Sequence, residues 1–146
     1  MYAVVCLLLV LPAADPKKEE VAKQELEKLQ GTWKFVAGER LGMKGEVGEG
    51  FEDFAIVISG NKLTIGVVKP TEATFVIDTT TDPKLIDITY TKDKSTTEAI
   101  YRVDGDTLTL CYRPGKPPAK DRPTAFKTDE KNEYEIRIYK RDKPKK

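Results

Sequence analysis

The feature that most constrains the fold is a change of periodicity at Gly31, where a helical pattern gives way to alternation. Before this glycine, apolar residues recur every three to four positions. From Trp33 onward they recur at every second position, which is the repeat of a β-strand with one buried face. The alternation returns in segments at 33–37, 54–58, 63–67, 73–77, 86–90, 99–103, 108–112 and 134–138. The sequence therefore predicts an all-β domain preceded by one helix.

Most of the predicted strands are joined by short turns, which favours an antiparallel meander. Asp104-Gly105-Asp106 has the composition of a hairpin turn, whereas the glycine-rich stretch 42–50 and the proline-rich stretch 113–123 predict longer loops. An open sheet of this length would expose two edges, and closure removes both. We expect an eight-stranded antiparallel up-and-down barrel, with a two-sheet sandwich as the alternative.

The N-terminal part of the chain divides into a leader and a short helix. Asp15 is a favourable N-cap, Pro16 suits the first helical position, and the helix should end at Gly31. Residues 1–14 hold an apolar run that ends in Pro-Ala-Ala, which predicts a signal peptide, although its start lacks basic residues. An N-terminal strand or helix of the domain is the alternative. We expect an exported protein, periplasmic or extracellular, with a barrel domain over 15–141 and a basic tail over 142–146.

The composition argues against several classes of function. The chain has 25 Lys and Arg residues against 24 Asp and Glu, so no global field favours nucleic acid. It has no histidine, which removes the commonest general base and the commonest zinc ligand. The apolar run near the N-terminus is too short to span a bilayer. We expect no enzyme activity, no cofactor and no metal, and an enzyme built on Lys84, Asp87, Cys111 or Arg122 is the least favoured hypothesis.

Several local signatures occur in an order that resembles an uncharacterised lipocalin-like domain family abundant in planctomycete bacteria. They are the segments at 25–34, 82–87, 100–108 and 122–126, together with Cys111. The resemblance implies a small exported barrel with no established activity. It also implies that Trp33 plugs one end of the barrel beneath an arginine of the last strand, for which Arg137 and Arg141 are the candidates. Ala125 departs from the family pattern, in which an acidic residue is expected.

Two functions remain open for such a barrel. The first is non-catalytic binding of a small, largely apolar molecule, because a barrel of this size is filled by side chains or holds one small ligand. The second is a protein-interaction or envelope-structural module with a filled core and an unknown partner. An interior void would favour the first function, and an exposed apolar patch would favour the second.

The candidate ligand-binding residues come from the apolar strand faces and from the loop at 122–126. They are Phe35, Phe54, Phe75, Tyr101, Tyr112, Arg122 and Phe126. In one interpretation Phe126 folds over the barrel mouth and Arg122 anchors an anionic ligand. In the other, Phe126 packs into the barrel end and Arg122 pairs with a nearby aspartate.

Overall fold

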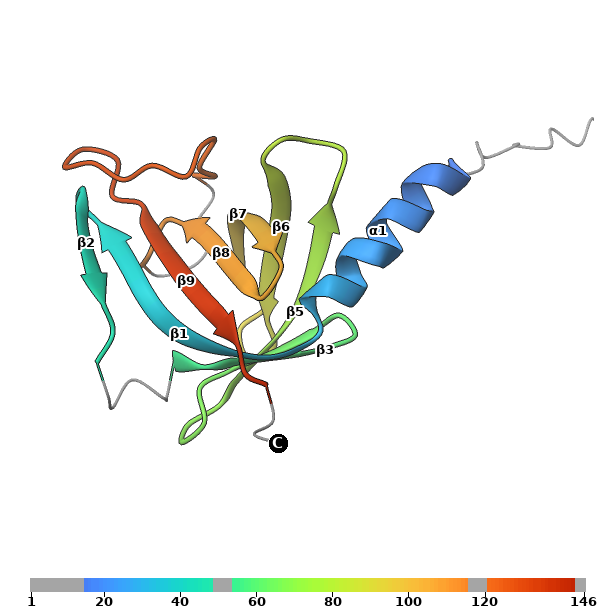
Figure 1. The fold of residues 1–146 in the computed structure, drawn as a ribbon, viewed down its shortest axis with the longest axis horizontal. Helices are drawn as coiled ribbons and strands as arrows, with labels where there is room; N and C mark the ends of the chain where they lie inside the picture. Colours follow the sequence, from blue (N-terminus) through green and yellow to red (C-terminus); the bar gives the residue numbers. More distant parts are fainter. Residues whose placement is uncertain (1–14, 49–53, 116–120, 144–146) are drawn as a thin grey trace, which may run out of the picture.

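The computed structural model describes residues 15–48, 54–115 and 121–143 and shows one helix and nine strands within these ranges (Figure 1). The helix, α1, runs from Pro16 to Leu29 and is capped by the Asp15 side chain, which accepts a hydrogen bond from the Lys17 amide. The strands are β1 (Gly31–Arg40), β2 (Met43–Glu46), β3 (Ile56–Ser59), β4 (Lys62–Ile65), β5 (Thr71–Asp78), β6 (Lys84–Tyr90), β7 (Thr96–Asp104), β8 (Thr107–Tyr112) and β9 (Glu135–Arg141). No helix in the described ranges is long and apolar enough to cross a membrane.

Eight of the described strands close into an antiparallel up-and-down barrel. The pairing runs in sequence order from β3 to β9, and β1 completes the ring by pairing with β3 on one side and β9 on the other. Every pairing is antiparallel. The predicted barrel is therefore confirmed, and closure through β1 and β9 excludes the two-sheet sandwich.

Strand β2 was not expected, because residues 42–50 are rich in glycine. Residues Met43–Glu46 pair with Ala37–Arg40 of β1, whereas β3 pairs only with Gly31–Trp33. The second half of β1 therefore has backbone groups that β3 does not reach, and β2 supplies their partners. Backbone hydrogen bonding here outweighs the weak strand propensity of the sequence.

One end of the barrel is closed by the end of α1 and by Trp33. Leu29 and Trp33 are completely buried, and the indole Nε1 donates a hydrogen bond of 2.8 Å to the Leu29 carbonyl. The Arg141 guanidinium lies 4.2 Å from the centre of the indole ring. It also donates to the carbonyls of Lys28 and Gln30, at 2.7 and 2.5 Å. We call this region the closed end. There, one arginine of β9 covers the indole and satisfies carbonyls at the end of α1.

A buried carboxylate attaches α1 to the barrel wall. Glu25 is 4% exposed and lies 2.8 Å from the Lys28 ammonium and 2.9 Å from that of Lys84. The Tyr101 hydroxyl is buried nearby, and burial, followed by the charge of Glu25, raises its pKa. Burial tends to raise the pKa of Glu25, but the hydrogen bonds and charges of the two lysines outweigh it and lower the pKa. The carboxylate is thus held ionised in the interface between helix and barrel.

Replacing Glu25 by Gln should lower the free energy of unfolding by about 1–3 kcal/mol at pH 7, because both lysine ammonium groups lose the negative charge with which they pair and one of them loses its acceptor. The folded pKa lies below the ordinary value of 4.5, so the contribution is complete above that pH and disappears as the pH falls through the folded pKa. Urea unfolding from pH 7 to pH 2.5 should show the two stability curves converging in acid. Glu27→Gln, at an exposed site of the same helix, is the control. A Glu25→Gln variant as stable as this control at pH 7 would contradict the interpretation.

Candidate ligand-binding cavity

A partly enclosed cavity of about 330 Å³ lies inside the barrel, away from Trp33. It reaches the first residue of β5, the last residue of β6 and the residues that follow β8, so it lies at the end opposite α1. We call this the open end. The cavity is lined by Ile56, Leu63, Ile65, Thr71, Ile88, Tyr90, Thr97, Leu110, Tyr112, Pro114, Gly115, Arg137 and Tyr139.

Strand alternation explains why these side chains meet in the interior. Ile56, Leu63, Ile88 and Leu110 belong to different strands, and each occupies an inward position in its own strand. Their aliphatic side chains form most of the wall, and hydroxyl groups of tyrosines and threonines interrupt it. Such a wall is typical of a small-molecule site, in which a few polar groups orient a mainly apolar ligand.

Among the described residues that line the cavity, Arg137 is the charged one, through its guanidinium. This side chain points inward from β9 and lies about equally far from three aromatic rings, at 5.5 Å from Phe35 and 5.6 Å from both Phe54 and Tyr112. Its Nε donates a hydrogen bond of 2.5 Å to Glu135, two residues earlier on the same strand. The Tyr112 hydroxyl donates to the same carboxylate oxygen at 3.4 Å. Arg137 and Glu135 therefore form a neutralised pair beside the aromatic rings.

The protonation states around this pair follow from burial. Burial raises the pKa values of the Tyr112 and Tyr139 hydroxyls, so both phenols remain protonated at neutral pH. For Arg137, burial acts to lower the pKa, but Tyr112, Tyr139 and the hydrogen bond to Glu135 outweigh it, and the net shift is upward. The cavity thus offers a permanent cation, neutral hydroxyls and an apolar wall.

The structure brings some of the candidate aromatic residues to this cavity and places others deeper. Tyr112 lines the cavity, and Phe35 and Phe54 lie beside it through their contacts with Arg137. Phe75 and Tyr101 belong to the packed core, with 3% and 1% exposure, and neither lines the cavity. The barrel is therefore filled toward its closed end and hollow toward its open end.

Arg122 and Phe126 lie on the outside of the barrel, so neither interpretation of Phe126 matches its position. Phe126 packs against a second apolar cluster formed by Ile100, Cys111 and Ile136, which are neighbours across the outer face of β7, β8 and β9. The Arg102 guanidinium covers its ring at 4.9 Å. The contact removes apolar surface of Phe126 and of these three strands from water, and this burial stabilises the position of the ring.

Arg122 attaches the same outer segment to the barrel wall. It donates to the Ala99 carbonyl at 2.7 Å and to the Asp87 carboxylate at 2.5 Å. This agrees with the alternative in which it pairs with a nearby aspartate. Neither Arg122 nor Phe126 lines the cavity.

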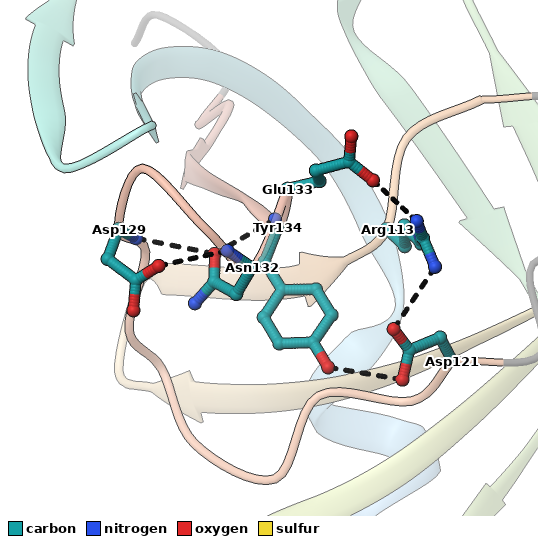
Figure 2. A network of polar contacts seen from close by, with 6 residues as sticks. All are labelled: Arg113, Asp121, Asp129, Asn132, Glu133 and Tyr134. Carbon is teal, nitrogen blue, oxygen red and sulfur yellow. Dashed lines mark hydrogen bonds and ion pairs between the residues drawn. The ribbon is translucent and has the colours of Figure 1, made fainter.

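A polar network fastens the segment 121–134 to the end of β8 (Figure 2). Arg113 bridges the carboxylates of Asp121, at 3.2 Å, and Glu133. The Tyr134 hydroxyl donates to Asp121 at 3.3 Å, and Asn132 is tied to Asp129 within the same turn. The segment is thus anchored at both ends of its path and acts as a cover over Ile100 and Cys111.

The candidate reactive residues are spread over several places. Lys84 pairs with Glu25, and Asp87 pairs with Arg122. The Cys111 thiol is fully buried beneath the Ala125 carbonyl, and burial raises its pKa to about 11. Among the described residues, no group of three or more His, Cys, Asp or Glu side chains is placed to hold a metal ion.

Among the cavity residues that sequence reasoning missed, the charged one is Arg137, which was considered only as a partner of Trp33. The alternation 135, 137, 139 and 141 along β9 contained the signal, since residues of equal parity share one face of a strand. Arg141 covers the indole at the closed end, whereas Arg137, four residues earlier, lies in the cavity at the open end.

No protein-family model, curated protein or solved structure matches this chain.

Proposed function

We propose that the barrel binds a small, largely apolar molecule non-catalytically in the cavity at its open end. The observation that carries this proposal is the interior void of about 330 Å³ between aliphatic walls. Its volume lies at the lower end of the roughly 300–1,000 Å³ typical of small-molecule sites. A barrel of this size can also be completely filled by side chains. The void therefore supports a ligand-binding barrel over a purely structural one.

The resemblance to small exported lipocalin-like domains supports export but brings no established activity to this chain. The leader at 1–14, on which export depends, lies outside the described residues. We propose export to the periplasm or the extracellular space on the sequence pattern alone, and ligand binding does not depend on it.

A cavity-filling substitution tests the binding proposal. 1-Octanol has nine non-hydrogen atoms, and at roughly 0.5 kcal/mol per atom its dissociation constant should be about 0.1–1 mM. Thr97 is buried and faces the cavity from β7, so Thr97→Phe should weaken octanol binding at least about tenfold. Isothermal titration calorimetry measures the loss, and circular dichroism verifies the fold.

The matched control is Val76→Phe, which adds the same ring to an exposed position on β5. It should bind octanol as the parent does. Equal binding by both variants, or no binding by the parent at millimolar octanol, would contradict the proposal.

A second candidate function is a protein-interaction module, and one surface feature favours it. Val67 and Val68, in the connection between β4 and β5, are 67% and 73% exposed. Adjacent exposed valines on a loop can contribute to an interface. The other large exposed apolar residues of the described ranges are spread over α1, the turn between β1 and β2, β2, the segment before β3, β3 and β5, so the cavity is the stronger observation. Failure of all octanol binding would direct attention to this loop.

A further inference from the structure

The charge balance at Arg137 indicates which class of small molecule the cavity accepts. This inference rests on the proposed function, because it concerns the ligand of the same cavity. An isolated cation in an apolar cavity would select an anion, since a carboxylate forms two strong bonds with a guanidinium. Arg137 is not isolated, because Glu135 holds its Nε at 2.5 Å.

The side chains of this pair are both largely removed from solvent, with 23% exposure for Arg137 and 16% for Glu135. A ligand carboxylate would have two ways to enter. It could share the guanidinium with Glu135, which would place two negative charges together in a partly buried site. It could instead displace Glu135, which would leave that carboxylate buried without its cation. Either arrangement disfavours an anionic ligand.

The guanidinium nevertheless has hydrogen-bonding capacity left. An arginine carries five N–H donors. Among the described residues, the Glu135 carboxylate accepts from its Nε. An uncharged acceptor, such as an amide or alcohol oxygen, could receive one of the remaining N–H groups without adding charge. It would also lose less hydration on entering the cavity than a carboxylate would.

We propose that the ligand is an uncharged amphiphile whose oxygen acceptor contacts Arg137 and whose apolar part lies against the aliphatic wall of the cavity. The wall residues Ile56, Ile65, Ile88 and Leu110 receive the apolar part. Glu135 is the residue that sets specificity, because it cancels the charge that would otherwise attract carboxylates.

The test compares three probes that each have eight carbon atoms and differ in the charge of the head group: octanamide, octanoate and octylammonium. Isothermal titration calorimetry of the parent protein at pH 7.5 should give octanamide the tightest binding, at least about tenfold tighter than octanoate. Octylammonium should also bind more weakly than octanamide, because an ammonium ion loses more hydration than an amide on entering the cavity and the neutralised pair has no net charge to attract it. The parent protein alone therefore shows whether the cavity prefers an uncharged ligand.

Glu135→Gln identifies the cause of that preference. Glutamine keeps the shape of the side chain and can still accept from Nε, but it removes the negative charge. Octanoate binding should strengthen at least about tenfold in this variant, whereas octanamide binding should change less than threefold. Glu72→Gln, an exposed position on β5, removes the same charge elsewhere and should leave the ratio of the two affinities unchanged.

The outcomes separate the two proposals. Octanoate binding to the parent as tightly as octanamide would overturn the inference and leave the proposed function intact. An unchanged ratio in Glu135→Gln would likewise overturn the role of Glu135. Absence of binding by all three probes at millimolar concentration would overturn both proposals.

Discussion

Replacing Trp33 by alanine is expected to lower the free energy of unfolding by about 3–5 kcal/mol, which is the range for emptying an aromatic core site. Trp33 is completely buried at the closed end, beneath Leu29 and Arg141. The substitution removes the ring, the hydrogen bond from the indole to the Leu29 carbonyl and the surface on which Arg141 stacks. For a domain of this length, the melting temperature should fall by roughly 10–20 °C.

Two further variants separate packing from other effects. Trp33→Phe keeps most of the ring but loses the N–H donor, so it should fall between the parent and the alanine variant. Val57→Ala, at a 42% exposed position on the outer face of β3, should change the free energy of unfolding by less than about 1 kcal/mol. A Trp33→Ala protein that melts within 2 °C of the parent would show that the indole does not close the barrel. Differential scanning calorimetry is the appropriate measurement.

Replacing Arg141 by lysine should lower the free energy of unfolding by about 2 kcal/mol, although the charge is kept. The guanidinium donates to two backbone carbonyls at the end of α1 and to Asp106, at 3.2 Å, while it stacks on the indole. A lysine ammonium is a point charge without the planar fork, so it cannot keep these contacts together. Hydrogen bonds that involve a charged group contribute about 1.5–3 kcal/mol each when buried, and less at this site, where the side chain is 25% exposed.

Lys143→Gln is the matched control, because Lys143 pairs with the same Asp106 but is 69% exposed. An exposed ion pair contributes little, so this variant should be nearly as stable as the parent. A double-mutant cycle between Trp33→Phe and Arg141→Lys should give a coupling energy of about 1 kcal/mol, because the cation and the ring are in contact. Equal stability of Arg141→Lys and Lys143→Gln in guanidinium chloride unfolding would contradict the role assigned to Arg141.

The fold could be predicted from local patterns because a barrel wall is built from local repeats. Alternation decides which face of each strand is apolar, and short turns decide that neighbouring strands pair. Strand β2 was not predicted, because its residues have weak strand propensity. They form a strand through pairing with backbone groups of β1 that β3 does not reach. Such a pairing depends on how far β3 extends along β1, which no local pattern records.

The candidate site was harder to predict, because apolar residues occur in the packed core, along the cavity and on the covered outer face of the barrel. A strand pattern does not distinguish these three environments. Phe75 and Phe126 both read as candidate lining residues, yet one fills the core and the other covers the outer face of β7, β8 and β9. Arg137 and Arg141 have the same side chain and the same inward orientation, yet one lies in the cavity and the other closes the opposite end. Whether a residue number is odd or even within a strand decides which face of the sheet its side chain occupies. Its position along the barrel axis depends on the register between neighbouring strands.

The sequence by itself determined the short helix and a succession of antiparallel strands, because periodicity and turn composition act locally. The pairing of β1 with β9 decided between the barrel and the two-sheet sandwich. Only the tertiary structure decided that the barrel is filled near Trp33 and hollow near Arg137. It also decided that Glu135 neutralises the arginine inside, and that the segment 121–134 covers the outer wall and not the mouth. These outcomes depend on how volumes and charges from distant parts of the chain meet, and on the closure of β1 against β9 that brings them together.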